Sequence, residues 1–403
     1  MYTPKLWVWE SATWPELSYD RDALAPLLNR ARACEGRLMG KADAIGTNEL
    51  SYIQRDVWAG EAVATAAIEG ETLDLADVRL SVTRRLGLAA ASVPAVPRHV
   101  DGLLDVMEDA AANWQTDLTE ERLCRWQAAL FPGSHSSLRD VEIGRYRSHA
   151  EAMQIVSGPI GKAVVHYEAP PSAAVRAEMR NFLDWFNGTR RSNTVDGILR
   201  AGFAHVRFET IHPFGDGNGR VGRAVVDMAI AQDARQPFRL HGVSMEIRRR
   251  QDAYYDALNR AQRGTGDVTD WLTWFVEVFC ESCQSSSRLI DEALVRARFW
   301  SQHKNVEINE RQRKVLNRML DRGPGNFEGG MTPRKYLALT GIKSITASRD
   351  LADLVTKAML VREGAGRSTY YNLAIPGWGW VPKLGQADPG RDGKESPLKE
   401  GAD

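Results

Sequence analysis

The sequence has no long apolar run and no leader-like start. None of its apolar segments approaches the about 20 residues that a helix needs to cross a bilayer. The N-terminus does not join a basic stretch to an apolar core, which is the pattern of a secretory leader. These absences argue against a membrane partner, and we expect the protein to be cytoplasmic.

Cysteine is scarce and the net charge is zero. The four cysteines, Cys34, Cys124, Cys280 and Cys283, include one Cys-x-x-Cys pair. Because no second pair lies near it in the sequence, small buried side chains are a better interpretation than a zinc or redox site. The 52 basic residues balance the 52 acidic ones. Bulk charge therefore favours neither nucleic acid nor a membrane as the main partner.

The composition is that of a globular, mainly α-helical protein with more than one domain. Hydrophobic residues make up 43% of the chain, and 403 residues exceed what one small core usually organises. Tryptophans near the start precede long segments rich in alanine and leucine. We expect an N-terminal helical module at 1–94, a helical core at 95–295, a C-terminal module at 300–375 and a flexible tail at 376–403.

One short segment, residues 211–223, combines the residue types that phosphate chemistry needs. It reads Ile-His-Pro-Phe-Gly-Asp-Gly-Asn-Gly-Arg-Val-Gly-Arg. Apolar residues recur at helical spacing before it, from Leu199 to Thr210, and again after Gly219. The glycine-rich loop should therefore open onto the N-terminus of a helix, where free backbone N–H groups and the helix dipole favour an anion.

Two arginines stand near the start of that second helix, which is the unfavourable end for positive charge. Arg220 and Arg223 are three residues apart, so both guanidinium groups face one side. An anionic ligand would resolve the conflict, and the planar fork of arginine suits phosphate oxygens. We expect phosphates to be bound by Gly217, Asn218, Gly219, Arg220 and Arg223.

Two further side chains supply chemistry beside this anion site. His212 has an ordinary pKa of about 6.5, so it can accept a hydroxyl proton near neutral pH. Asp216 offers hard oxygen ligands to a Mg²⁺ ion that keeps most of its waters. We predict that His212 is the catalytic base and that Asp216 positions the metal, while Phe214 is a buried anchor for the loop.

At every fixed position the segment resembles the Fic-family signature His-x-Phe-x-(Asp/Glu)-Gly-Asn-Gly-Arg-x-x-Arg. The resemblance implies a helical Fic core that moves AMP from ATP to a side-chain hydroxyl of a target protein. It also implies that the first arginine contacts the inner phosphates and the second the γ-phosphate. The glycines at 217, 219 and 222 match a dinucleotide-binding fingerprint as well, but that fingerprint needs a preceding strand, and here a helix is expected.

A second, shorter motif lies upstream. Residues 65–70, Thr-Ala-Ala-Ile-Glu-Gly, resemble the family's inhibitory motif (Ser/Thr)-x-x-x-Glu-(Gly/Asn). The resemblance implies that Glu69, carried on a helix with Thr65, pairs with Arg223 and occupies the group that orients the γ-phosphate. A bidentate arginine–carboxylate pair competes directly with an arginine–phosphate pair. An ordinary exposed helix glutamate is the alternative that the motif alone leaves open.

Two short apolar runs, at 154–156 and 162–167, surround a turn-rich segment, which predicts a β-hairpin. Fic proteins carry such a flap, and a target segment is thought to add to its open edge as an extra strand. Three flap residues, Val165, His166 and Tyr167, align with positions that touch the nucleotide in the family. We therefore expect these three residues to bind ATP.

Other positions carry weaker family signals. Tyr254 and Tyr255 match a tyrosine pair that lines the adenine pocket in relatives, although simple amphipathic helix residues are the alternative. Gln262 stands where some relatives have asparagine. His205 fits a buried, hydrogen-bonded packing residue better than a second base. Residues 144–147, Gly-Arg-Tyr-Arg, resemble a family element with a structural role.

The C-terminal module resembles a winged helix. Helices are expected at 309–320, 332–339 and 344–357, and strands at 359–362 and 368–373 around a glycine-containing turn. Winged helices bind DNA or contact proteins, and four basic residues here could meet phosphates: Lys343, Arg349, Lys357 and Arg367. Because the module has no dense basic stripe, DNA is the less favoured partner.

We interpret the chain as an autoinhibited protein adenylyltransferase that uses ATP and Mg²⁺ to modify a Ser, Thr or Tyr hydroxyl of a target or of itself. A homodimer is common among relatives. Two alternatives are open. In the first, the same site removes AMP or transfers another phosphate-containing group, which a mass shift on the target would reveal. A protein of another class, a DNA-bound transcriptional regulator, could use the core to sense a nucleotide.

Overall fold

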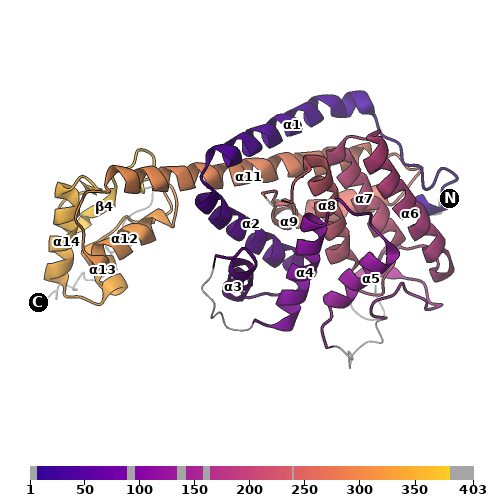
Figure 1. Cartoon of the computed structure of the whole chain (residues 1–403), viewed down its shortest axis with the longest axis horizontal. Helices are drawn as coiled ribbons and strands as arrows, with labels where there is room; N and C mark the ends of the chain where they lie inside the picture. Colours follow the sequence, from indigo (N-terminus) through magenta and orange to yellow (C-terminus); the bar gives the residue numbers. More distant parts are fainter. Residues whose placement is uncertain (1–6, 89–95, 134–141, 158–163, 238–239, 382–403) are drawn as a thin grey trace, which may run out of the picture. The chain divides into compact units, whose positions relative to one another are not determined.

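The computed structural model of the protein describes residues 7–88, 96–133, 142–157, 164–237 and 240–381. The chain divides into two compact units, residues 1–290 and 291–403. Helices dominate the described residues, which confirms the predicted mainly α class (Figure 1). The N-terminal helices share the first unit with the core, whereas the sequence suggested separate regions at 1–94 and 95–295. None of the helices in the described ranges is both long and apolar enough to cross a membrane.

The first unit is a helical assembly that begins with a short 3-10 turn, η1 (Val8–Glu10). Its helices are α1 (Arg21–Ala44), α2 (Thr47–Ile68), α3 (Leu75–Arg85), α4 (Arg98–Ala112), α5 (Glu120–Ala129), α6 (Ser172–Ser192), α7 (Gly197–Ile211), α8 (Asn218–Ala234), α9 (Val243–Arg249), α10 (Gln251–Ala261) and α11 (Thr269–Gln302). The last of these continues along the chain into the second unit.

Helices α7 and α8 form the centre of this unit. Every residue of α7 is buried, and α7 packs between α6 and α8, while α4 also packs on α8 (Figure 1). The helix starts at a capping carboxylate, Asp196, which accepts from the backbone N–H of Ile198 at 2.9 Å. It stops at Ile211 because His212 turns left-handed and Pro213 cannot continue a helix. A helix buried on all sides fixes the position of the residues at its end.

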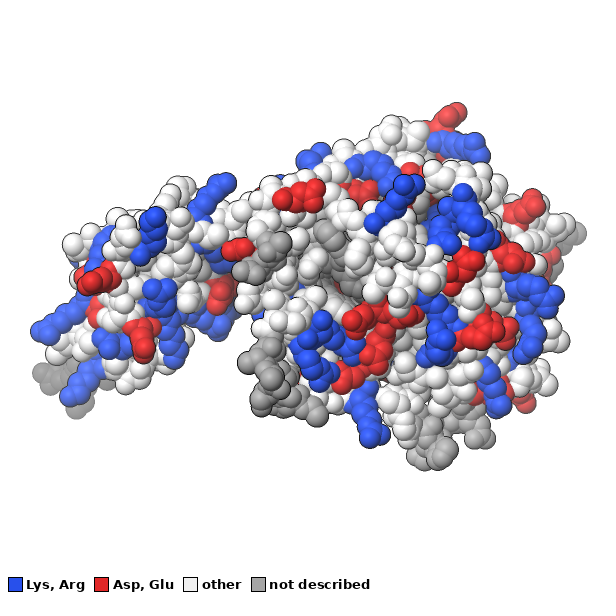
Figure 2. Space-filling view, viewed as in Figure 1, with Lys and Arg blue, Asp and Glu red and all other residues white. Residues whose placement is uncertain are grey.

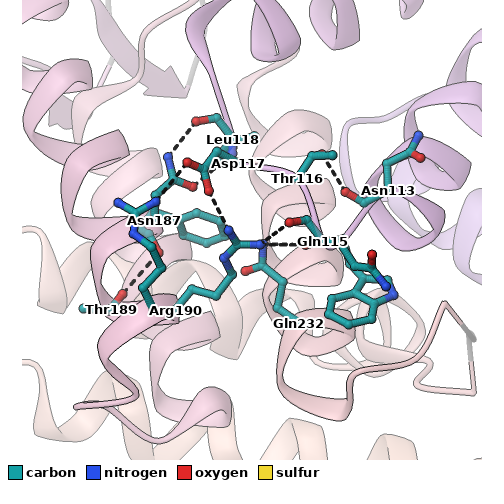
Figure 3. A network of polar contacts seen from close by, with 12 residues as sticks. Asn113, Gln115, Thr116, Asp117, Leu118, Asn187, Thr189, Arg190 and Gln232 are labelled. Atoms are coloured by element: carbon teal, nitrogen blue, oxygen red, sulfur yellow. Dashed lines mark hydrogen bonds and ion pairs between the residues drawn. The ribbon is translucent and has the colours of Figure 1, made fainter.

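A loop before α5 is tied to the core by side chains from two helices (Figure 3). The amide of Asn187 on α6 exchanges two hydrogen bonds with the backbone of Leu118, at 3.0 and 2.9 Å. Arg190 of the same helix donates to the carboxylate of Asp117 at 2.6 Å, and Gln232 of α8 donates to the carbonyl of Trp114 at 2.9 Å. This network holds the loop that precedes α5 against α6 and α8.

Helix α2 packs against α3 and α9, and it reaches α8. Its buried Glu61 accepts from the backbone N–H groups of Ser244 at 3.0 Å and Met245 at 2.8 Å, at the start of α9. Burial, together with the charge of Asp227, raises the pKa of Glu61 to about 7. The helix ends at Ile68, and Gly70 follows with a φ of 79°, a conformation that glycine adopts at little cost.

The predicted hairpin is present. Strands β1 (Gln154–Ser157) and β2 (Val164–Glu168) are antiparallel, and residues 158–163 between them lie outside the described residues. The register shifts between Ile155 and Val156, so the two strands do not keep one continuous alternation of faces.

The second unit matches the predicted order of three helices and a hairpin. Its elements are α12 (Glu310–Leu320), α13 (Pro333–Thr340), α14 (Ser344–Thr356), β3 (Leu360–Glu363), a 3-10 turn η2 (Gly366–Ser368) and β4 (Tyr370–Leu373). The packed part extends beyond the expected boundary at 375, because Trp378 joins the hydrophobic core and Asn372 donates to the carbonyl of Trp380 at 3.0 Å. The expected tail from 382 onward lies outside the described residues.

Charge on the second unit is mixed. Figure 2 shows Lys and Arg side chains interspersed with Asp and Glu over the face it displays. Some basic side chains are engaged locally, since Lys357 pairs with Asp353 at 2.6 Å and Arg311 with Asp350 at 3.2 Å. The winged-helix identity and its DNA partner stay predictions.

Three of the four cysteines are buried, as predicted for small packing residues. Cys34, Cys280 and Cys283 are buried, and Cys124 is partly buried. The thiols of Cys34 on α1 and Cys280 on α11 lie next to each other.

Candidate active site

His212 caps the C-terminus of α7. It has a φ of 49°, and its ring Nδ1 lies 3.4 Å from the carbonyl oxygen of Glu209. A proton on Nδ1 points at this acceptor, which leaves Nε2 as a proton acceptor. Burial, with a smaller contribution from the positive charge of Arg147, lowers the pKa of His212 to about 4. The imidazole is therefore neutral at pH 7, as a general base must be.

Arg147 holds the backbone around His212. Its Nε donates to the carbonyl of His212 at 2.8 Å, and its Nη2 donates to the carbonyls of Ile211 at 3.3 Å and Pro170 at 2.5 Å. The backbone N–H of Arg147 donates to the carbonyl of Pro213 at 2.9 Å. The structural role predicted for residues 144–147 is therefore present, because these bonds satisfy carbonyls that the end of α7 leaves unpaired.

The glycine-rich loop turns onto the start of α8. Gly217 has a φ of 86° and stands at the N-cap without a side-chain hydrogen bond, so the first backbone N–H groups of α8 have no side-chain cap. Asn218 accepts from the N–H of Phe214 at 2.9 Å and donates to its carbonyl at 2.7 Å. Phe214 is fully buried, as predicted for a loop anchor. The amide of Asn218 thus shapes the loop.

A cavity of about 750 Å³ brings most of the predicted site residues together. Its wall includes these predicted residues: Glu69, His166, His212, Asp216, Gly217, Asn218, Gly219, Tyr254 and Tyr255. Four other predicted residues, Thr65, Val165, Tyr167 and Arg223, do not line it, and Arg220 faces a smaller cavity of about 220 Å³ beside Glu71. The volume of the larger cavity is typical of small-molecule sites.

Arg223 is held by the end of α2. Its Nε donates to the hydroxyl of Thr65 at 2.6 Å, and its Nη2 donates to the carbonyl of Thr65 at 3.0 Å and to Oε1 of Glu69 at 2.8 Å. Burial alone would raise the pKa of Glu69, but the pairing with Arg223 holds it below its ordinary value. The predicted contact between the two motifs is therefore present, although they are far apart in sequence.

Arg220 is held by a residue that the sequence did not single out. Its Nη1 donates to both carboxylate oxygens of Glu71, at 2.8 and 2.9 Å, and its guanidinium lies 5.2 Å from the centre of the Phe131 ring. The sequence offers one weak signal for this contact, an acidic residue two positions after the inhibitory glutamate. Both arginines of the signature are thus bound to carboxylates from the α2–α3 segment.

The Arg223–Glu69 pair brings together charges that each helix places at its unfavourable end. Arg220 and Arg223 stand near the positive N-terminus of α8, and Glu69 stands at the negative C-terminus of α2. A Cβ atom at Gly219 would lie 2.1 Å from Oε1 of Glu69. Gly219 therefore allows the carboxylate to approach the first turn of α8, where an anionic ligand would otherwise lie.

Glu209 is a second functional candidate that the sequence did not reveal. It lines the cavity, is 5% exposed, and its Oε2 lies 3.8 Å from Nδ1 of His212. Burial, reinforced by the negative charge of Glu69, raises the pKa of Glu209 to about 8. The side chain is therefore mostly protonated at pH 7. Its place inside a fully buried helix made it resemble a packing residue.

The tyrosines predicted to contact the nucleotide, Tyr254 and Tyr255 on α10 and Tyr167 on β2, differ in where their side chains lie. Tyr254 and Tyr255 line the cavity; the hydroxyl of Tyr254 lies 3.0 Å from Nε2 of His205, and that of Tyr255 donates to the carbonyl of Ile68 at 3.0 Å. His205 is fully buried, as predicted for a packing residue.

Tyr167, by contrast, faces the protein interior. Its hydroxyl donates to the carbonyl of Thr210 at 2.5 Å, and its ring meets Trp7 edge-on at 5.3 Å. The side chain is 1% exposed, so the predicted nucleotide contact of Tyr167 has no structural basis. Val165 is likewise absent from the cavity wall, which leaves His166 as the predicted β2 residue on the wall.

Asp216 fits a metal that arrives with a phosphate ligand. Its side chain is 51% exposed, and Oδ1 accepts from the N–H of Gly217 at 2.6 Å and lies 3.8 Å from Arg220. Among the described residues, no three His, Cys, Asp or Glu side chains form a metal-binding group. A single carboxylate matches Mg²⁺ that takes its other ligands from phosphates and water.

Comparison with known proteins identifies the class of this site. Residues 117–230 match the Fic/DOC family, and residues 7–88 match a domain of unknown function, DUF4172. The chain therefore carries a Fic domain, which confirms the resemblance of its signature. His212 to Arg223 fall inside the Fic match, and Thr65, Glu69 and Glu71 fall inside the other.

The named relatives are protein adenylyltransferases. The chain is 30% identical over 107 residues to the probable protein adenylyltransferase aq_aa38 of Aquifex aeolicus, over 27% of this chain and 30% of that protein. It is 24% identical over 204 residues to protein adenylyltransferase Fic of Nematostella vectensis, over 49% of this chain and 42% of that protein. The match thus spans less than half the length of either relative.

Solved structures share the fold. A Fic family protein from Desulfovibrio desulfuricans G20 superposes with a TM-score of 0.52 and 21% identity, covering 89% of this chain and 98% of that one. Fic-1 from C. elegans gives a TM-score of 0.50 and 20% identity, covering 68% of this chain and 74% of that one. These neighbours confirm a helical Fic core.

Proposed function

We propose that this protein transfers AMP from ATP to a hydroxyl side chain of a target protein or of itself. One observation carries the proposal: a neutral histidine stands on the wall of the cavity that the N-terminus of α8 adjoins. The signature supplies a base and an anion site in one short segment, which suits a reaction that depends on positioning and on neutralising phosphate oxygens. The names of the curated relatives support the same activity.

The proposed step uses the chain's own groups as follows. The hydroxyl oxygen of the target attacks the α-phosphorus of ATP and gives its proton to Nε2 of His212. The bond from the α-phosphorus to the bridging oxygen breaks, and pyrophosphate leaves. Arg220 and Arg223 neutralise the departing phosphates. Asp216 would hold the Mg²⁺ ion that screens the phosphate charge.

The same geometry supports a proposed inhibition of the site. In this conformation Arg223 is bound by Thr65 and Glu69, and Arg220 by Glu71. A triphosphate would have to displace these carboxylates before it could bind both guanidinium groups. We propose that the N-terminal domain acts as a brake, with Glu69 as the main contact and Glu71 as a second contact.

The target would approach along the hairpin. Ile155 and Val156 of β1 and Val164 of β2 are exposed, and Ile155, Val156 and His166 line the active-site cavity. An exposed strand edge offers backbone hydrogen bonds to an extended peptide. A segment that adds to this edge would carry its hydroxyl towards His212.

The test is an intact-mass measurement on purified protein and cell extract with ATP. The Glu69→Gly variant should gain the mass of one or more AMP groups on itself or on an extract protein, and Glu69→Gly combined with His212→Ala should gain none. A mass gain that corresponds to phosphate would favour another group transfer by the same site. AMP transfer that persists without His212 would contradict the assignment of the base.

A further inference from the structure

A second cavity, of about 470 Å³, shares no lining residue with the active-site cavity. It lies between the segment that precedes α1 and helices α6 and α7, and three aromatic side chains contribute to its wall: Tyr19, Trp185 and Phe203. Tyr19 and Phe203 meet edge-on at 5.5 Å, and Trp185 meets Phe203 edge-on at 6.4 Å. The cavity therefore has a continuous aromatic surface of a size typical of small-molecule sites.

A buried arginine of α7, Arg207, lines this cavity. Arg207 is 4% exposed, and its guanidinium carbon lies 4.5 Å from the centre of the Trp185 ring. Its Nε is buried without a hydrogen-bond partner, and no described residue forms an ion pair with the guanidinium. The negative charge of Glu178 acts to raise the pKa of Arg207. The carboxylate of Glu178, however, accepts a hydrogen bond from the indole N–H of Trp14 at 2.8 Å.

The other buried arginine of α7 shows what a structural arginine looks like here. Arg200 is 3% exposed and donates to the carbonyls of Phe186 at 3.4 Å and Ala229 at 3.2 Å and to Gln232 at 2.7 Å. Arg207 makes no such bonds within the part of the chain that the structure describes, and a buried cation without hydrogen bonds is costly. Burial lowers the pKa of Arg207 to about 10, so the group is still charged at neutral pH.

We propose that this cavity binds a small carboxylate with a flat apolar body, such as an aromatic acid. The fork of Arg207 matches the two oxygens of a carboxylate, and the aromatic wall accepts a ring. Glu16, Asp184 and Arg21 stand at the exposed part of the wall. Together with Arg207 their charges balance, which favours a singly charged anion over a multiply charged one such as a phosphate. The carboxylate would supply the hydrogen bonds that Arg207 lacks.

The test uses the full chain and ligand-observed NMR with benzoate and indole-3-carboxylate as probes. At least one carboxylate should bind saturably, its neutral amide should bind more weakly, and inorganic phosphate should not compete. Arg207→Met should weaken binding by on the order of tenfold or more, because charge-assisted hydrogen bonds are lost. Arg180→Met, an exposed arginine of α6 outside the cavity wall, should leave binding unchanged.

A second variant separates binding from folding. Arg207→Lys keeps the charge but not the fork, so it should bind the carboxylate with an affinity between those of wild type and Arg207→Met. Circular dichroism and thermal unfolding would report whether each variant is folded. The proposal is overturned if neither carboxylate binds the wild type, if Arg207→Met or a folded Arg207→Lys binds as tightly as the wild type, or if phosphate displaces the probe.

Discussion

The two arginines of the signature are held in different ways. Arg223 is 4% exposed at its side chain and makes three hydrogen bonds, to Thr65 and to a Glu69 side chain that is 32% exposed. Arg220 is equally buried, but it depends on Glu71, whose side chain is 46% exposed. The first contact is part of a helix end packed on the core, whereas the second comes from the segment that follows α2.

The difference indicates how the two contacts would share the proposed inhibition. A charge pair loses most of its strength when water can reach one partner, so the Glu71 contact should be the weaker of the two. The Glu69 contact is further fixed by Gln251 and Tyr255, which both donate to the carbonyl of Ile68, at 3.1 and 3.0 Å. We therefore expect Glu69 to dominate inhibition and Glu71 to modulate it.

The largest effect is expected from Glu69→Gln. Removal of the carboxylate charge frees Arg223 for the γ-phosphate, and AMP incorporation should rise about tenfold or more, the worth of one charge-assisted hydrogen bond. The measurement is incorporation of label from ATP labelled at the α-phosphate. Glu151→Gln, whose side chain is 85% exposed, is the control and should behave as wild type.

The pH dependence of the unfolding free energy, through Glu209, provides a second test of the two carboxylate contacts. Its folded pKa is raised to about 8, first by burial and then by the charge of Glu69. Its contribution to stability is therefore fully present below about pH 4.5 and is lost as pH rises through about 8. Urea unfolding of wild type and Glu209→Gln at pH 5 and pH 8 should show a difference in unfolding free energy that changes by about 3.5 kcal/mol in favour of the variant at high pH.

The same experiment on Glu69→Gln distinguishes the two carboxylates. Without the charge of Glu69 the pKa of Glu209 should fall, so the pH dependence should shift to lower pH. Glu71→Gln should not move it, because Glu71 does not contribute to the pKa shift of Glu209. An equal shift in both variants would contradict the separation of the two contacts.

Glu71→Gln should have a smaller effect on transfer, on the order of threefold, because its carboxylate is partly solvated. The double variant with Glu69→Gln should exceed either single variant. Initial rates of AMP incorporation, at one ATP concentration, measure all three. A rise for Glu71→Gln that matches Glu69→Gln would show that the exposed contact is as important as the buried one.

The smallest effect is expected from Tyr255→Phe. The variant keeps the ring in the cavity but loses the hydrogen bond to the carbonyl of Ile68, which stabilises the end of α2 by about 1 kcal/mol at most. Inhibition should loosen by about twofold. Incorporation below the wild-type level would instead indicate that the hydroxyl assists nucleotide binding.

The central site could be predicted from the sequence because its parts are local. His212, Gly217 and Arg220 lie within one loop and one helix turn, so helical periodicity and glycine placement were enough to arrange them. The pairing of Glu69 with Arg223 joins distant segments, and only the family resemblance predicted it.

The errors have physical causes. A strand alternates its faces, so the register shift between Ile155 and Val156 decides which β2 side chains face the cavity, and sequence does not reveal such a shift. Tyr167 is buried, with its hydroxyl bonded to the carbonyl of Thr210. Glu71 was missed because its position two residues after Glu69 is only a weak signal, and the sequence does not show which cation it meets after folding. Trp378 was assigned to a tail because glycine and proline around it resemble a linker.

One labelling experiment tests the central claim most directly. The Glu69→Gln protein is incubated with ATP that carries the label either at the α-phosphate or at the γ-phosphate, with and without the further change His212→Ala. The account predicts protein-bound label from the α position alone, and none in the His212→Ala background. Label from the γ position, or α label that persists without His212, would contradict it.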